Sequence, residues 1–350
     1  MLIERGGSPR PIESYISKNG TGYNWIKIGD ADETGYINKT EEKIKASGLT
    51  KTRKVFKGDL ILSNSMSFGR PYILNIDGCI HDGWLLLRDR NKVFNILFLK
   101  NYLETSYCLK QYQRTAAGGV VSNLNKDIVS NVTINYPIIQ EQNKISIFFE
   151  LLDLKIQILK FKINALKKYK KGIIDLWFKR PGKKVKLCRL VNQQTSQLLT
   201  SQIKDNHGDY PVYDVSGNIY KTINFYENPN DSIAIIKYGS GCGRTFISKN
   251  KHSVLGTMTE LIPFCSNDLL YIFSFTESIQ FKKACKKYTE VGTTPNLYYS
   301  DYSNEMVFYP QKINVFVQFI DLMTKKYRNL EAQRNILNKL KLQFLKDMFI

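Results

Sequence analysis

The chain has 350 residues, which is too long for one ordinary domain and fits two domains with room for connecting helices. Its 51 Lys and Arg residues outnumber 31 Asp and Glu residues, and the formal net charge of +20 favours association with polyanions such as nucleic acid. The absence of a signal-like or membrane-spanning apolar run, together with six scattered cysteines that form no CxxC pair, predicts a cytoplasmic protein with reduced thiols and excludes a zinc ribbon or a disulfide framework.

The first 138 residues predict a module of mixed strands and helix. Short apolar runs bounded by Gly, Asp or Asn indicate strands at 25–28, 60–62, 72–74 and 84–87. A longer stretch, 95–114, has apolar residues at helical spacing.

A long helix is predicted next, over 139–180. From Ile145 to Leu166 the apolar residues alternate at spacings of four and three, which is a heptad seam, and Lys170 interrupts it before Trp177 resumes it. Pro181 and Gly182 end the helix. Its polar face is rich in lysine, which is more often a solvated surface than a binding surface.

A second module is predicted over 181–311 and a second long helix over 312–350. Strands fit 210–213, 233–236 and 259–262, and a helix fits 278–288. The seam of the first helix, shifted by 171 positions, returns from Ile320 to Met348, and Lys341 interrupts it where Lys170 interrupts the first (341 − 170 = 171). We therefore expect the two helices to pair as an antiparallel coiled coil, although each helix packing on its own module is the simpler alternative.

The two modules carry an internal repeat. The segment from Gly119 to Leu124 returns from Gly292 to Leu297 with an offset of 173 (292 − 119). In the first module a predicted strand is followed by a polar loop and by Gly69-Arg70. The second module has the same order of strand, loop and Gly243-Arg244, with an offset of 174 (243 − 69). Such a repeat predicts two related modules, each of which meets its partner in a related way.

The repeated loops are the candidate binding elements. Backbone N–H groups and an arginine fork suit phosphate oxygens or guanine edges, although Gly at positive φ in a plain hairpin explains the same pattern. We predict DNA contacts from a set of residues on these loops and on the repeated segments: Asn64, Ser65, Gly69, Arg70, Asn123, Asn125, Lys237, Tyr238, Gly241, Gly243, Arg244 and Asn296.

Catalytic residues are not expected. The three histidines, His81, His207 and His252, stand next to no obvious nucleophile or metal partner. The stretch 239–243 lacks the GKS/T ending of a phosphate loop. The charge triple 41–43 falls in a polar stretch rather than on a strand, which disfavours a nuclease site. We therefore expect no metal ion and no cofactor in this chain.

The order of module, long helix, module and long helix resembles the specificity subunit of Type I restriction-modification systems. Each motif that supports the resemblance is weak by itself, and the specific signal is the order in which the motifs occur. They lie at residues 5–11, 25–30, 58–59, 68–71 and 81–84, in the segment that begins at 118–125 and ends at Pro137, and at 141–142. The implied fold class is α+β (mixed α/β), with two target-recognition domains in a pseudo-twofold repeat, separated by two long helices that form an antiparallel coiled coil.

The resemblance also implies a function. Each target-recognition domain would read one half of a bipartite, asymmetric site in double-stranded DNA, while the helices would set the gap and dock two modification subunits. Those subunits would methylate adenine with S-adenosylmethionine, and restriction (translocase and nuclease) subunits would be further partners. Two alternatives stay open: the specificity subunit of a combined methyltransferase-nuclease that cuts on both sides of its site, and a coiled-coil scaffold that binds no DNA.

The first module departs from the family pattern at its start. The segment 183–190 opens the second module, yet the first module begins almost directly at Arg5-Gly6-Gly7. Either the start of the chain is misassigned or truncated, or the C-terminal end helps to close the first module.

Overall fold

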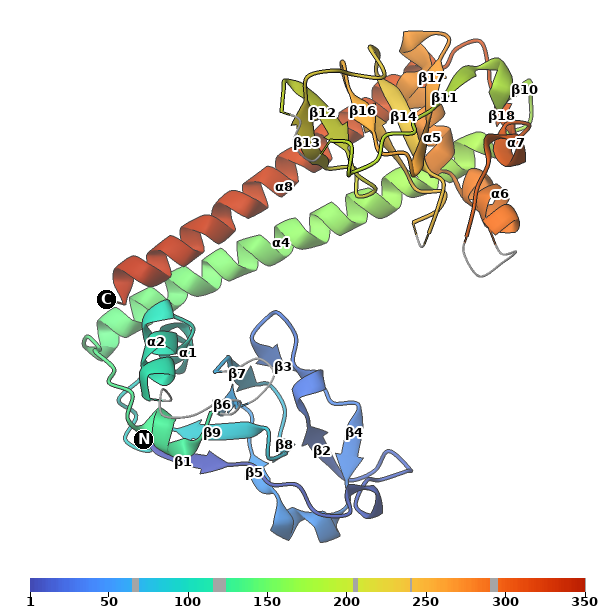
Figure 1. Ribbon diagram of the computed structural model, residues 1–350. Coiled ribbons are helices and arrows are strands. Elements are labelled where there is room, and N and C mark those ends of the chain that lie inside the picture. The colour runs from blue at the N-terminus through green and yellow to red at the C-terminus, as the bar shows by residue number, and fades with distance from the viewer. Residues whose placement is uncertain (65–68, 116–123, 204–206, 240, 290–294, 350) are drawn as a thin grey trace. The chain divides into compact units, whose positions relative to one another are not determined.

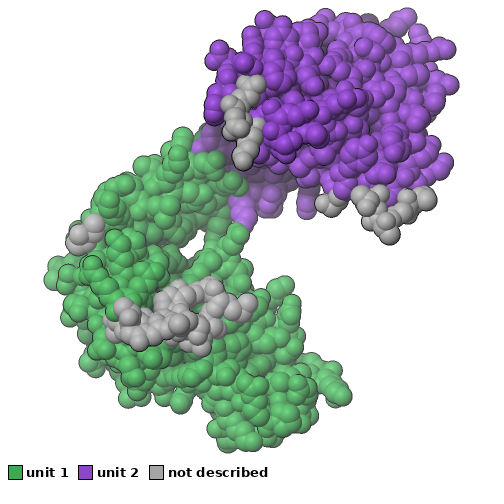
Figure 2. Space-filling model, in the orientation of Figure 1, with its two compact units in different colours: residues 1–158, 333–350 green, residues 159–332 purple. Residues whose placement is uncertain are grey.

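The computed structural model describes residues 1–64, 69–115, 124–203, 207–239, 241–289 and 295–349. The chain divides into two compact units, one of residues 1–158 with 333–350 and one of residues 159–332 (Figure 2). Each unit therefore contains one globular module and a part of each long helix. The four-part division at 138, 180 and 311, which treats the helices as separate spacers, remains a proposal.

Among the described residues, two sheets, three short α-helices and three 3₁₀ helices (Ile12–Ser14, Ile28–Asp30 and Ala46–Lys51) form the module of the first unit (Figure 1). The larger sheet has the order β1-β9-β6-β7-β3, with strands Leu2–Arg5, Trp84–Arg88, Leu60–Ser63, Pro71–Leu74 and Tyr36–Ile37. The smaller sheet has the order β4-β2-β8-β5, with strands Glu42–Ile44, Tyr23–Ile26, Gly78–Ile80 and Arg53–Val55. The helices are α1 (Ile96–Leu103), α2 (Ser106–Thr115) and α3 (Lys126–Ser130).

The module of the second unit has the same kinds of layers (Figure 1). Its larger sheet has the order β11-β17-β14-β15, with strands Val191–Thr195, Met258–Pro263, Ser232–Ile236 and Thr245–Ser248. A three-stranded sheet has the order β13-β12-β16, with strands Ile219–Ile223, Tyr210–Tyr213 and Ser253–Val254, and β10 (Lys184–Lys186) pairs with β18 (Met306–Phe308). The helices are α5 (Leu269–Glu277), α6 (Ile279–Thr289) and α7 (Tyr299–Tyr302).

The internal repeat is a repeat of topology. The sheet order β1-β9-β6-β7 matches β11-β17-β14-β15, and β4-β2-β8 matches β13-β12-β16. Helices α1, α2 and α3 begin at 96, 106 and 126, while α5, α6 and α7 begin at 269, 279 and 299, each 173 positions later. The prediction of two related mixed α/β modules is confirmed.

Strand alternation places the cores of the first unit. Leu60 and Leu62 of β6 face the core shared with the helices, whereas Ile61 between them faces the core beneath the other side of the sheet. Phe349, one residue before the end of the chain, lies in the helical core, where its ring stacks on Phe149 with centroids 5.8 Å apart. The C-terminal end of the chain thus contributes to the core of the first module.

The two long helices are α4 (Ile139–Phe178, 40 residues) and α8 (Asn314–Met348, 35 residues). In the first unit, Asp153 of α4 binds Lys341 near the end of α8, at 2.6 Å between Oδ1 and Nζ. In the second unit, Trp177 near the end of α4 stacks on Phe316 near the start of α8, with ring centroids 4.6 Å apart. A second contact in each unit, Phe148 with Phe344 in the first and Lys170 with Thr324 in the second, shows that the helices run antiparallel within each unit.

The predicted seams coincide with the buried faces of these helices. Every seam residue from Ile145 to Trp177 and from Ile320 to Phe344 is buried or half-buried. Met348 is the exception, with 42% of its surface exposed, because Leu345 and Phe349 occupy the core at the last turn instead. No helix in the described ranges combines the length and apolar composition needed to cross a membrane.

Two local predictions differ from the structure. The stretch 95–114 is two helices rather than one, because the Thr105 hydroxyl donates to the Tyr102 carbonyl and accepts from the Cys108 amide, which ends one helix and caps the next. Strand β2 ends at Ile26, and the Asp30 carboxylate accepts the Lys27 amide at 2.7 Å to close a 3₁₀ turn.

Candidate nucleic-acid interface

The hairpin between β6 and β7 in the first module is held by paired backbone hydrogen bonds. The Gly69 amide donates to the Ser63 carbonyl at 2.9 Å, and the Ser63 amide donates to the Arg70 carbonyl at 3.0 Å. Gly69 has φ +73°, and a Cβ there would lie 3.0 Å from the Tyr112 ring of α2. Glycine is required for both reasons.

The hairpin between β14 and β15 in the second module has the same construction. The Gly243 amide donates to the Ile236 carbonyl at 3.0 Å, and the Ile236 amide donates to the Arg244 carbonyl at 3.0 Å. Gly243 has φ +78°, and a Cβ there would lie 3.0 Å from Cys285 of α6, the position equivalent to Tyr112 (285 − 112 = 173). The hairpin interpretation of both glycines is confirmed, and their contact with DNA stays a prediction.

The repeated Asn-Leu segment is bound to each hairpin. The Leu124 amide donates to the Asn64 carbonyl at 2.7 Å, and the Leu297 amide donates to the Lys237 carbonyl at 2.9 Å. Asn64 and Lys237 are themselves equivalent (237 − 64 = 173). Both leucines are buried. The two elements found separately in the sequence are therefore one structural unit that the chain builds twice.

The two hairpin arginines are in different states. In the first module, Arg70 is half-buried, its guanidinium donates to the Glu33 carbonyl at 3.1 Å and it lies 5.4 Å from the centre of the Tyr72 ring. In the second module, Arg244 is exposed, and its side chain has no hydrogen bond or ion pair to any described residue. Arg244 is ready to bind a ligand, whereas Arg70 would first have to leave its partners.

Tyr238 and Asn296 are exposed beside the second hairpin. Tyr238 is 40% exposed and forms an isolated backbone bridge with Asn296. Lys237 is buried, burial lowers the pKa of its ammonium group, and its Nζ lies 5.4 Å from the centre of the Tyr238 ring. Tyr238, Arg244 and Asn296 thus form the exposed part of the candidate interface of the second module, and Gly241 lies half-buried beneath Arg244.

Two of the predicted asparagines have partners within the fold. The Asn64 side-chain amide donates to the Asp82 carbonyl at 2.7 Å, and Asn64 is buried. Asn125 caps α3 by accepting the Ile128 amide at 2.8 Å. Ser65 and Asn123, which were also predicted to contact DNA, lie outside the described residues.

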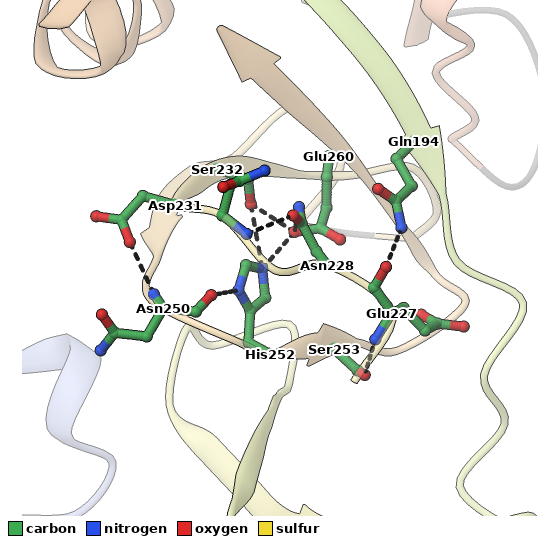
Figure 3. Close-up of polar contacts among 10 residues, drawn as sticks. Gln194, Glu227, Asn228, Asp231, Ser232, Asn250, His252, Ser253 and Glu260 are labelled. Carbon is green, nitrogen blue, oxygen red and sulfur yellow. Dashed lines mark hydrogen bonds and ion pairs between the residues drawn. The ribbon is translucent and has the colours of Figure 1, made fainter. Parts of the chain in front are cut away.

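The expectation that His252 stands next to no obvious nucleophile differs from the structure, in which the Ser232 hydroxyl lies 3.2 Å from His252 Nε2. Glu260 on β17 accepts the Ser232 hydroxyl at 2.5 Å, and its Oε1 lies 2.5 Å from His252 Nε2, as Figure 3 shows. Asn228 also donates to the same oxygen, at 3.2 Å. Strand pairing brings these distant positions together, and the one local signal was a carboxylate inside the apolar run 258–263.

This cluster is structural rather than catalytic, because Ser232, His252 and Glu260 are all fully buried and no substrate can reach them. Burial alone would lower the pKa of His252, but the hydrogen bond and the charge of Glu260 outweigh it and raise the pKa. The second ring nitrogen, Nδ1, lies 2.8 Å from the Asn250 carbonyl. The imidazolium can therefore donate from both nitrogens and neutralise the buried carboxylate.

The nuclease-like charge triple is also placed differently from the prediction. Glu42 and Lys43 lie on β4, because this edge of the small sheet pairs with β2, and Glu42 binds Lys27 at 2.9 Å. Within the described ranges, no group of three or more His, Cys, Asp or Glu side chains is arranged to hold a metal ion. The six cysteines are unpaired.

Comparison with known proteins gives a family match in the first half of the chain and structural matches over its whole length. Residues 3–168 match the model of the Type I restriction modification DNA specificity domain. The whole chain resembles the S subunit of a Type-I restriction-modification system from M. genitalium, with a TM-score of 0.62, 14% identity and coverage of 100% of this chain and 93% of that chain. A second solved structure, which concerns the complex assembly and conformational transition of the type I R-M system, matches with a TM-score of 0.62, 15% identity and coverage of 99% of this chain and 97% of that chain. At these identities the structural likeness establishes the fold.

Proposed function

We propose, from the match of residues 3–168 to the Type I restriction modification DNA specificity domain, that this protein is the DNA sequence-specificity subunit of a Type I restriction-modification complex. Each module reads one half of a bipartite, asymmetric target in double-stranded DNA. The observation that carries the proposal is the recognition unit built twice, with the Leu124 and Leu297 amides bound to equivalent hairpins on sheets of the same strand order.

Base recognition in the second module would come from Arg244, with Tyr238 and Asn296 beside it. An arginine fork reads guanine through two parallel hydrogen bonds in the major groove, and a side chain without internal partners makes them without first breaking others. In the first module, Arg70 would exchange its bond to the Glu33 carbonyl for a DNA acceptor. The net binding free energy contributed by Arg70 would therefore be smaller than that contributed by Arg244.

The helices α4 and α8 would act as the spacer that sets the unread gap and as the dock for two modification subunits. Those subunits would carry S-adenosylmethionine and methylate adenine, with restriction subunits as further partners. The chain itself would supply specificity and no chemistry, and it would bind no cofactor. Because its six cysteines are unpaired, we place it in the cytoplasm.

The test is duplex binding by the chain assembled with its companion modification subunit, measured over a range of salt concentrations. For a complex that binds DNA, the logarithm of the association constant falls linearly with the logarithm of the salt concentration, with a slope of about −0.9 for each phosphate contacted. Weak binding that does not change with salt would instead indicate a coiled-coil scaffold. A companion that carries both methyltransferase and nuclease activity in one polypeptide would indicate the combined enzyme that cuts on both sides of its site.

A further inference from the structure

The lysines that interrupt the two helical seams have different surroundings. In the first unit, Lys341 Nζ lies 2.6 Å from Asp153 Oδ1 and 3.9 Å from Glu104 Oε2. This half-buried cation is therefore neutralised inside the unit. Its charge is satisfied without any external partner.

In the second unit the equivalent lysine lacks such a carboxylate. Asp153 is replaced by Thr324 (324 − 153 = 171), whose hydroxyl accepts from Lys170 Nζ at 2.8 Å and donates to the Ile320 carbonyl at 2.7 Å. The counterpart of Glu104 is Glu277 (277 − 104 = 173), which binds Lys282 at 3.5 Å. Among the described residues, Lys170 has no carboxylate within ion-pair distance, and burial lowers the pKa of its ammonium group.

Lys170 lines a pocket of about 380 Å³ between α4, α8 and α5, within the second unit. The pocket is lined by four lysines and by one carboxylate, that of Glu277, which leaves a formal excess of three positive charges. The lysines are Lys167, Lys170, Lys171 and Lys282.

The corresponding positions of the first unit are neutral. There, Lys100 and Lys341 are balanced by Glu104 and Asp153, and Lys100 Nζ lies 2.8 Å from Glu104 Oε1. The positions of Lys167, Lys171 and Lys282 are occupied by uncharged side chains, those of Asn338, Leu342 and Leu109. Because the two sites share one architecture, the charge excess is a property of the second unit and not of the fold.

A second pocket, of about 410 Å³, lies beside the β14–β15 hairpin. It is lined by Arg244 and Lys286, and it shares Glu277 and Lys282 with the first pocket. The two pockets therefore adjoin at Glu277 and Lys282, and we call the pair, which extends from the β14–β15 hairpin to the helix pair within the second unit, the basic furrow. The pocket lined by Lys170, which is the inner end of the furrow, has the volume of about a dozen water molecules, and this is enough for a hydrated phosphate group.

We propose that this furrow binds the phosphate backbone of the target DNA, with Lys170 as the cation that receives a phosphate at its inner end. The proposal rests on the function proposed above. One end of the furrow is the hairpin that would read bases. The sugar-phosphate backbone of a DNA strand bound at this hairpin would therefore lie along the furrow. A phosphate would supply the negative charge that Asp153 supplies in the first unit.

The test introduces into the second unit a carboxylate equivalent to Asp153, the partner of Lys341 in the first unit. Thr324→Asp places a carboxylate beside Lys170, as Asp153 lies beside Lys341, and Thr324→Val is the matched uncharged control. Lys170→Gln is a second variant that removes the cation itself. Each chain is assembled with its modification subunits and titrated with a specific duplex and with a random duplex at several salt concentrations, and thermal unfolding checks that each variant is folded.

Thr324→Asp and Lys170→Gln are expected to weaken binding to both duplexes by the same factor, about eightfold at 0.1 M salt, and to make the salt slope shallower by about 0.9. Thr324→Val should leave the slope unchanged. A folded Thr324→Asp complex with unchanged affinity and slope would overturn the proposal. Loss of a modification subunit with the salt slope retained would also overturn it, because the pocket would then receive an acidic side chain of that subunit.

The proposed function fails separately. If the wild-type complex shows no salt-dependent binding to duplex DNA, the role in DNA recognition is rejected, and the furrow proposal is rejected with it. If the wild-type slope is steep and the pocket variants match it, only the furrow proposal is rejected.

Discussion

Replacement of Arg244 by alanine tests whether the second hairpin reads bases. Arg244 is exposed and its side chain has no hydrogen-bonding partner among the described residues. The free energy of unfolding should therefore change by no more than about 0.5 kcal/mol. If the guanidinium makes a bidentate contact to guanine, its loss should weaken binding by about 1–3 kcal/mol, or about 5- to 150-fold.

The matched variant is Arg70→Ala in the first module. Arg70 donates to the Glu33 carbonyl and lies against the Tyr72 ring, so its removal should cost about 1–3 kcal/mol of stability. The two arginines occupy equivalent hairpin positions, and the pair therefore separates a residue that is ready for DNA from one that is engaged in the fold. Urea denaturation of the isolated chains measures this difference.

The binding assay uses the assembled complex and three duplexes, one with both half-sites and one with each half-site scrambled. Arg244→Ala should lower affinity for any duplex that contains the half-site of the second module and should leave the remaining duplex unaffected. Equal weakening on all three duplexes would refute base reading and assign Arg244 to phosphate. No loss on any duplex would remove Arg244 from the interface.

Three further predictions concern stability. His252→Gln should lower the free energy of unfolding by about 3–5 kcal/mol, because it leaves Glu260 buried without its charged partner, and a denaturant midpoint equal to that of the wild type would contradict this. The raised pKa of His252 means that its ion pair contributes fully below the ordinary histidine range and is lost as pH rises through the raised value, so urea midpoints should fall from pH 6 to pH 9 and His252→Gln should flatten that trend. Phe349→Ala should cost about 3–5 kcal/mol in the first module, read by thermal unfolding, and an unchanged transition would show that the C-terminal ring does not stabilise that core.

The sequence predicted best those features that local spacing determines. The heptad seams and the lysines that interrupt them depend on a period within a single segment, so Lys170 and Lys341 were identified at equivalent positions. The strands around 60–62 and 233–236 were found for a similar reason, since continuous apolar runs between turn residues are local signals. The repeat predicted the shared topology because equal offsets require equivalent elements.

The features that the sequence did not predict depend on long-range pairing. Ser232, His252 and Glu260 meet only through the pairing of the strands around them, and no local pattern marks them as a set. Equivalence in the repeat also did not predict that Arg70 is engaged by the Glu33 carbonyl while Arg244 is not. Nor did it show that Thr324 leaves Lys170 without the carboxylate that Lys341 has.

The most direct test of the central claim is a methylation map. The chain would be co-expressed with its companion modification subunit in a host that lacks DNA methylation, and N6-methyladenine would be located across the genome. The account predicts one split, asymmetric motif with a constant gap between its halves. Methylation at a single half-site, or none despite a stable complex, would contradict the claim that both modules read DNA.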